Sequence, residues 1–154
     1  MSGAIVVGVD GSDTSRAALL WAADEARLRT ARLVAVHAWS FIPAQPIGDP
    51  GMLAIPTGDL TGQLSAESEA ARAVLADAVA EVLEGAPGIE VEQRLVEGDP
   101  GDALVAESKT AELVVVGSHG RSGLKAALLG SVSRHVVSHA ACPVVVVKLG
   151  GDGG

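Results

Sequence analysis

A glycine-rich stretch in the C-terminal half carries the residue types that could bind phosphate. Three valines precede Gly117, and the chain continues through Gly120, Gly123 and Gly130 to Ser131. This order predicts a buried strand, a loop and a helix. Glycine permits positive φ and close approach to the main chain, and free amides at a helix start attract anions. The stretch therefore predicts a phosphate cradle built from backbone N–H groups and the Ser131 hydroxyl.

The charge pattern favours a small anion as the ligand. Between Leu113 and Gly151 there is no Asp or Glu, whereas residues 1–112 hold 18 Asp or Glu and 7 Lys or Arg. Nucleic acid requires a broad basic face, which a chain of net charge −8 does not offer. The cations of the acid-free segment are Arg121, Lys125, Arg134 and Lys148. For Arg121 and Lys125, a phosphate contact and a solvated surface position are both open.

The spacing Gly117-x2-Gly120-x9-Gly130-Ser131 resembles that of the ATP-binding universal stress proteins. The opening Val6-Val7-Gly8-Val9-Asp10-Gly11-Ser12 is also similar to that family's first strand and turn, so the resemblance spans about the whole chain. It implies an adenine nucleotide as ligand, namely ATP with or without Mg²⁺. It also implies a Rossmann-like fold of the adenine nucleotide alpha hydrolase type.

The resemblance further implies a role for each segment. Adenine or ribose would lie beside residues 8–10, Ala38 would hydrogen-bond adenine through its backbone, and residues 116–117 would line the ribose. Phosphates would lie against Gly120 and residues 130–132. The full set of expected binding residues is Gly8, Val9, Asp10, Gly11, Ala38, Val116, Gly117, Ser118, His119, Gly120, Arg121, Ser122, Gly123, Gly130, Ser131 and Val132.

Several of these residues also have a purely structural explanation. Asp10 could end the first strand and cap the first helix, and the glycines could serve turns only. Ser131 could cap its helix and bind phosphate at once. His37 and His119 are more often structural than catalytic, and Cys142 is expected to be a small buried hydrophobe.

The surrounding elements must bring these segments together. β-Branched or alternating runs predict five strands, and apolar positions at helical spacing predict four helices between them. The strands are expected at 4–9, 33–38, 89–96, 114–116 and 143–147, and the helices at 14–29, 63–84, 99–110 and 131–139. Ser12 or Asp13 can cap the first helix, and Asp99 with Pro100 starts the third.

Alternating strands and helices predict a five-stranded parallel, doubly wound α/β sheet with right-handed crossovers. In the order 3-2-1-4-5, strands one and four flank the point where the order reverses. Ligands bind such sheets outside the carboxyl ends of the strands, at that point. The crevice would then collect residues 10–12, residues 37–38 and the loop from Gly117.

Two further segments bear on organisation. Residues 40–62 contain four Pro and four Gly and must be irregular, either disordered or functional. The run Val144–Val147 would be buried on both faces, yet a terminal strand leaves an open edge. We expect this edge to pair with a second copy, and the resemblance likewise suggests a homodimer through it. Trp21 would be in the core or in an interface.

Length and composition predict one domain. The 154 residues are expected to form a single domain over 1–149 with a flexible tail at 150–154. No apolar run approaches about 18 residues and no signal-type segment opens the chain, so we expect a cytoplasmic protein without a membrane partner. A single cysteine excludes an intrachain disulfide, and no histidine cluster suggests a metal site.

Three classes of function fit these features. A regulatory module of the stress response, in which ATP occupancy alters dimer or partner contacts, is the one we favour. A slow ATPase or phosphate-transferring enzyme is the second, although there is no Walker-type Gly-x4-Gly-Lys-Ser/Thr and Asp10 is the only carboxylate expected at the crevice. An interaction protein that binds no nucleotide is the third.

Overall fold

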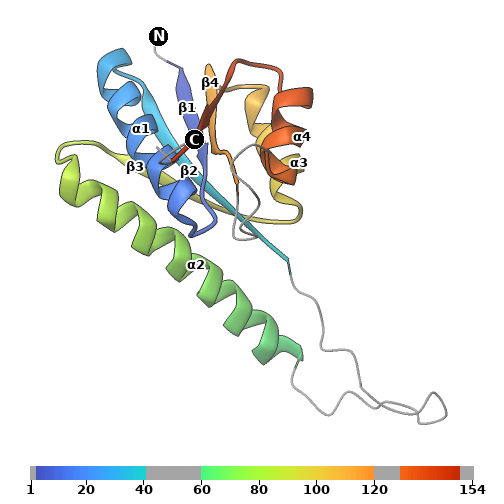
Figure 1. Ribbon diagram of the computed structural model, residues 1–154. Helices are drawn as coiled ribbons and strands as arrows, with labels where there is room; N and C mark the ends of the chain where they lie inside the picture. Colours follow the sequence, from blue (N-terminus) through green and yellow to red (C-terminus); the bar gives the residue numbers. More distant parts are fainter. Residues whose placement is uncertain (1–2, 41–59, 120–128, 150–154) are drawn as a thin grey trace.

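A parallel sheet of five strands forms the middle layer of the structure, a computed structural model that describes residues 3–40, 60–119 and 129–149 (Figure 1). All neighbouring strands run parallel in the order β3-β2-β1-β4-β5. This confirms the predicted fold class and strand order. The strands are β1 (Ala4–Gly8), β2 (Arg32–Trp39), β3 (Val91–Glu97), β4 (Leu113–Gly117) and β5 (Val144–Val147).

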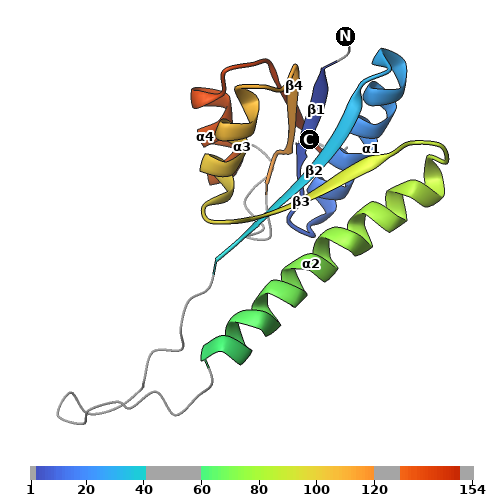
Figure 2. The ribbon, with the colours of Figure 1, turned by 180° about the vertical axis from the view of Figure 1, so that it is seen from behind.

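Helices cover both faces of the sheet. α1 (Asp13–Arg29) and α2 (Leu60–Gly85) lie on one face, and α3 (Pro100–Ser108) and α4 (Ser131–His139) lie on the other. Figure 2 shows the same layers from behind. The predicted doubly wound arrangement is therefore present, with the first two crossovers on one face of the sheet and the last two on the other.

The core on each face is made of small aliphatic side chains. Along β1, Ile5 and Val7 pack under α1 and α2, whereas Val6 packs under α3 and α4. β4 divides in the same way, with Val115 on the first face and Val114 on the second. Because strands covered on both sides need no polar face, their sequences read as continuous apolar runs.

Helix caps fix where the chain turns from strand to helix. Ser12 is the N-cap of α1, and its side chain accepts a hydrogen bond from the Ser15 amide. Asp99 caps α3 through the Asp102 amide, with Pro100 at the start of the helix. Both caps are among those predicted, since Ser and Asp side chains satisfy free first-turn amides.

Some element bounds differ from the predicted ones. α2 begins at Leu60 rather than residue 63, so Gly62 is helical, although glycine costs a helix about 1 kcal/mol. β3 begins at Val91 rather than residue 89. The expected irregular segment falls mostly at residues 41–59, outside the described residues.

α2 extends well beyond the sheet. Its 26 residues span about 39 Å, whereas the 7 residues of β3 span about 23 Å. Nearly all side chains at 61–70 are exposed, and the buried positions of α2 begin at Ala71. Figures 1 and 2 both show the N-terminal half of this helix projecting away from the other elements.

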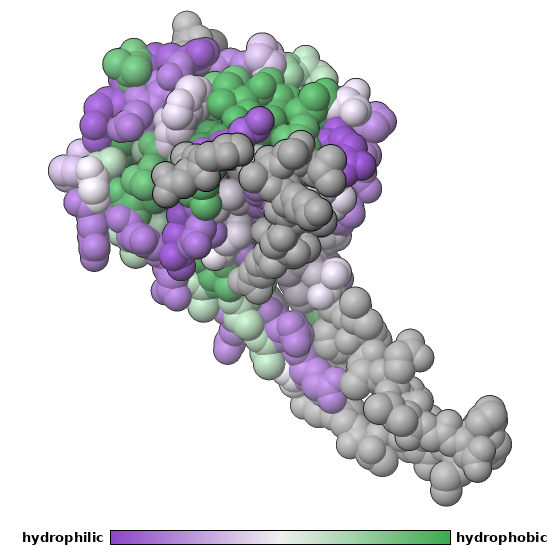
Figure 3. Space-filling model, viewed as in Figure 1, coloured by the Kyte–Doolittle hydropathy of each residue, from purple (hydrophilic) through white to green (hydrophobic). Residues whose placement is uncertain are grey.

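β5 forms one edge of the sheet. All four of its valines are half-buried, so the expectation of burial on both faces is wrong for the single chain. In Figure 3 hydrophobic residues gather on the part of the surface where β5 lies in Figure 1. Trp21 is 37% exposed on α1 and does not belong to the core. No helix in the described ranges has the length and hydrophobicity needed to cross a bilayer.

Candidate functional site

A cavity of about 390 Å³ opens at the carboxyl ends of β1, β2 and β4. The first turns of α3 and α4 form its opposite wall. It lies at the position where the strand order reverses, which is the expected ligand position in a sheet of this kind. Its described lining residues are Gly8, Val9, Asp10, Ser15, Val36, His37, Ala38, Pro100, Leu104, Val116, Gly117, His119, Gly130, Ser131, Val132 and Ser133.

The structure brings most of the expected binding residues to this cavity. Those that line it are Gly8, Val9, Asp10, Ala38, Val116, Gly117, His119, Gly130, Ser131 and Val132. Gly11 and Ser118 are described but do not line it. The remaining four, Gly120, Arg121, Ser122 and Gly123, lie outside the described residues, as does Lys125.

The N-terminus of α4 offers free backbone donors to the cavity. Its N-cap is Gly130, in extended conformation and without a side-chain cap, whereas Ser12 and Asp99 cap α1 and α3. Ser131 is therefore the first helical residue, and its predicted role as cap is wrong. Residues 131–133 all line the cavity. Because first-turn amides lack helical partners, this end of α4 suits an anion.

Hydrogen bonds join the residues just after β4 to those at the start of α4. The Ser118 carbonyl accepts hydrogen bonds from the Gly130 amide at 2.7 Å and from the Ser133 hydroxyl at 3.1 Å. The same hydroxyl lies 3.0 Å from the Gly130 carbonyl, and Ser133 is buried. Arg134 adds a bond to the Leu129 carbonyl at 3.0 Å. These contacts join the end of β4 to the start of α4.

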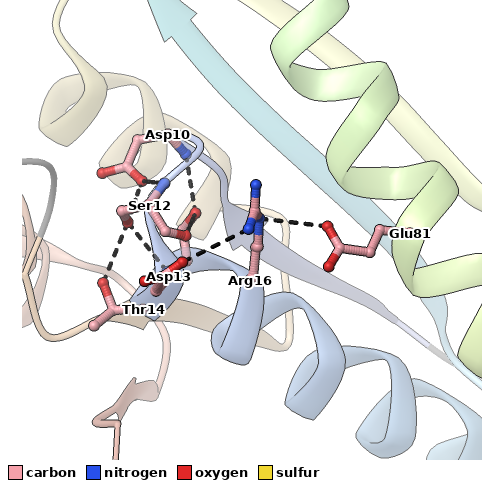
Figure 4. A network of polar contacts seen from close by, with 7 residues as sticks. Asp10, Ser12, Asp13, Thr14, Arg16 and Glu81 are labelled. Atoms are coloured by element: carbon pink, nitrogen blue, oxygen red, sulfur yellow. Dashed lines mark hydrogen bonds and ion pairs between the residues drawn. The ribbon is translucent and has the colours of Figure 1, made fainter.

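The start of α1 also contacts this loop. The Asp10 carboxylate accepts hydrogen bonds from the Ser12 amide, at 2.8 Å, and from the Ser12 hydroxyl (Figure 4). Asp10 thus orients the cap of α1 rather than capping the helix itself. The Thr14 hydroxyl donates to the His119 carbonyl. On the far side of this turn, Arg16 lies 3.4 Å from Glu81 of α2.

Close packing, rather than positive φ, explains glycine at the ends of β1 and β4. A Cβ on Gly117 would lie 2.9 Å from the Thr14 carbonyl carbon, which is backbone. A Cβ on Gly8 would lie 2.8 Å from the end of the Leu104 side chain. Positive φ is found instead at Gly11, at 84°, where the chain turns into α1.

Hydrophobic side chains form the wall between the sheet and α3. Val36, Pro100, Leu104 and Val116 lie here, next to the polar end formed by α4. Pro100 and Leu104 were not among the predicted binding residues, nor were the first-turn serines Ser15 and Ser133. The rule that ligands meet the carboxyl ends of strands could have suggested the first turn of α3, because that helix follows β3.

The end of β2 contributes both a side chain and a backbone segment. His37 Nδ1 lies 2.7 Å from the Val9 carbonyl oxygen, and Ala38 is half-buried at the cavity. The second histidine, His119, places Nδ1 3.1 Å from the Ser118 hydroxyl. Its Nε2 is buried and has no hydrogen-bond partner within the described structure.

The charges of the cavity are few. Asp10 is the only acidic residue among its described lining residues, and no Lys or Arg is among them. The described ranges contain no group of three or more His, Cys, Asp or Glu that could hold a metal ion. Backbone dipoles at α4, rather than side-chain charges, therefore supply the positive potential in the described part of the cavity.

Comparison with known proteins agrees with this architecture. A sequence model described as the universal stress protein family matches residues 1–148. The chain belongs to the universal stress protein family. A universal stress protein of Mycolicibacterium smegmatis is 40% identical over 145 residues, which are 94% of this chain and 45% of the relative. The chain thus spans about half the length of the curated relatives it matches.

Solved universal stress proteins share the fold. One, in complex with cAMP, has 30% sequence identity and a TM-score of 0.65, covering 96% of this chain and 97% of that one. Another, from Archaeoglobus fulgidus in complex with dAMP, has 28% identity and a TM-score of 0.64, covering 95% and 98%. Both ligands of these two relatives contain adenine and a phosphate group.

Proposed function

We propose that this universal stress protein binds an adenine nucleotide, with ATP as its ligand, and acts as a regulatory module of the stress response. The observation that carries the proposal is the uncapped N-terminus of α4, which opens into a cavity whose other wall is hydrophobic. A nucleotide has the matching polarity, since its base is largely apolar on its faces and its phosphates are anionic. The volume of about 390 Å³ is within the range of small-molecule sites.

The base would lie between the end of β2 and α3. Val36 and Leu104 offer hydrophobic contact, and the backbone of Ala38 offers hydrogen bonds at the same wall. The Val36 carbonyl points toward β1 and accepts a hydrogen bond from the Val9 amide, just beyond that strand. Backbone groups of alternate strand residues share a direction, so those of Ala38 also point toward β1, beyond its last residue, Gly8.

The phosphates would lie against α4. The amides of residues 131–133 and the Ser131 hydroxyl supply donors there, and the helix dipole favours negative charge. Mg²⁺ would be coordinated mainly by phosphate and water, as is usual for nucleotide sites. The Asp10 carboxylate already accepts two hydrogen bonds from Ser12, which leaves it a weak candidate ligand.

Calorimetric titration with ATP tests the proposal, with Gly130→Asp as the decisive variant. An Asp at the N-cap would cover the free amides of α4 with its own carboxylate and repel phosphate, while stabilising the helix by about 0.2–0.5 kcal/mol relative to glycine. We expect saturable ATP binding by the native chain and its loss in the variant, at an unchanged or higher melting temperature. Equal affinity of the two proteins would place the phosphates elsewhere.

The same samples separate binding from catalysis. A regulatory module holds its nucleotide, so phosphate release during long incubation should not exceed that of ATP alone. Steady release that disappears in Asp10→Ala would instead support the ATPase. If no binding is seen at millimolar ATP, the remaining alternative is an interaction protein that binds no nucleotide.

We further propose that two copies associate through β5. Its four valines are half-buried in the single chain, and Leu149 just beyond it is 49% exposed. An unpaired apolar edge strand is a ready template for another strand. Pairing of two β5 strands would cover this edge and join two sheets.

A further inference from the structure

The end of β2 departs from the hydrogen-bond ladder that joins it to β1. The last ladder bond runs from the Val9 amide to the Val36 carbonyl, at 2.8 Å. In a parallel ladder that continued, the next bond would run from the Ala38 amide to the Val9 carbonyl. The backbone hydrogen bonds of the described residues include none between these two groups. The Val9 carbonyl lies instead 2.7 Å from His37 Nδ1.

The direction of the His37 contact follows from its partner. A carbonyl oxygen can only accept, so Nδ1 must carry the proton and donate. The imidazole therefore takes the place of the Ala38 amide at the Val9 carbonyl. Because Ala38 lines the cavity and is half-buried, its released N–H is available to a ligand rather than lost inside the sheet.

We propose that His37 is a positioning residue for base selectivity: by occupying the Val9 carbonyl, it keeps the Ala38 amide free to donate to an acceptor on the base edge. This inference rests on the proposed nucleotide function and names its selectivity. Adenine presents an acceptor at N1, whereas guanine presents an N–H there. A free Ala38 amide would pair with the first and oppose the second, and such unpaired polar groups discriminate strongly.

The hydrogen-bond exchange can be tested without any ligand. Hydrogen exchange of backbone amides by NMR should show fast exchange at Ala38 and slow exchange at Val36 in the native chain, because only the Val36 amide belongs to the ladder. In His37→Leu, which has no donor, the Ala38 amide should turn to the Val9 carbonyl and become protected. A protected Ala38 amide in the native, ligand-free chain would overturn the inference.

Binding measurements then test selectivity. His37→Leu should lower ATP affinity about tenfold, the equivalent of one hydrogen bond, and should leave GTP affinity unchanged or raise it, so that the ATP to GTP preference falls at least about tenfold. His37→Asn should keep the preference, because its side-chain amide can still donate to the Val9 carbonyl. His139→Leu is the matched control, since His139 Nδ1 makes the same type of contact, at 2.9 Å from the His135 carbonyl, outside the cavity lining.

The outcomes separate this inference from the proposed function. If His37→Leu weakens ATP and GTP equally, His37 has only a structural role and the inference fails. If the native chain binds neither nucleotide, the proposed function fails, and the exchange rate of the Ala38 amide still decides whether His37 releases it. A fast-exchanging Ala38 amide in the native chain supports the release even if His37→Leu does not fold.

Discussion

Gly117 shows how one missing side chain allows two elements to meet beside the cavity. In Gly117→Ala the new Cβ would lie 2.9 Å from the Thr14 backbone, so α1 or β4 must shift. We expect a loss of about 1–3 kcal/mol in the free energy of unfolding. Urea denaturation measures it, with Gly85→Ala as control, because nothing lies within 4 Å of a Cβ there. A Gly117→Ala protein as stable as the native chain would contradict this packing.

Ser133 makes the side-chain contacts that join the end of β4 to the start of α4. Ser133→Ala removes two contacts, yet the Ser118 and Gly130 carbonyls keep one amide partner each. We therefore expect a modest loss of about 0.5–1.5 kcal/mol and weaker ATP binding. Calorimetry and thermal unfolding check both effects against Ser138→Ala, an exposed serine of the same helix. Unchanged ATP affinity would show that the site does not depend on this contact.

Cys142 offers a test of local burial. Burial raises the pKa of the Cys142 thiol above its usual value, so less thiolate is present near pH 8. A thiol reagent such as DTNB should react more slowly with the folded protein than with the urea-unfolded chain at the same pH. Equal rates would mean that the thiol is freely accessible, against its half-buried position under the α3 and α4 layer.

The sequence located residues that follow strands, but not those that reach the cavity from across the fold. Asp10 is recognisable because it follows an apolar run, and Gly130 because of its spacing from Gly117 and Gly120. Leu104 and Ser133 are ordinary residues of helical segments, and only the packing of α3 and α4 brings them to the site. The contact of His37 with the Val9 carbonyl could not be predicted from the sequence either, since it depends on where β1 ends relative to β2.

At the scale of elements, ion pairs lie along the exposed part of β3. Arg94 pairs with Glu92 and with Glu107 of α3, and its hydrogen bond holds the pKa of Glu92 below the usual value. A lowered folded-state pKa means that this stabilisation is complete above the unfolded pKa of about 4.5 and is lost as pH falls through the folded value.

Glu92→Gln tests this pH dependence. The groups are well exposed, so the native chain should exceed the variant by no more than about 1 kcal/mol at pH 7. In urea denaturation the difference should shrink as the pH falls through the lowered pKa of folded Glu92, because protonation then removes the native charge as well. Glu90→Gln, an exposed position just before β3, should show no such trend. A difference that stays constant as the solution is acidified would have to arise from something other than the carboxylate charge.

Elements were predictable where the apolar pattern is regular. Ser131–His139 has the predicted bounds, and β5 begins at Val144, one residue later than predicted. The start of α2 was missed because Gly62 was assigned to the preceding Pro- and Gly-rich segment, although a long helix tolerates one glycine. Local composition therefore marks element interiors better than their ends.

At the scale of the whole molecule, the outer edge of β5 predicts self-association. The Pro143 and Val147 carbonyls point toward β4, so the backbone groups of Val144 and Val146 point outward. Val146→Pro would remove an outward N–H group and keep the hydrogen bonds between β4 and β5. We therefore expect this variant to be a folded monomer, which analytical sedimentation measures. Val145→Pro is the control that breaks the ladder itself and should lower stability. A Val146→Pro protein that remains dimeric would exclude pairing through this edge.

Residues 61–70 of α2, which project beyond the sheet, should affect how the protein unfolds. A helix segment of about ten residues without tertiary support is marginal in water, so residues 61–70 should open independently of the sheet. Denaturant then acts on a cooperative unit smaller than the full chain. The m-value of the global transition should consequently fall below that expected for 154 residues, and deleting these helical turns should leave the midpoint almost where it was.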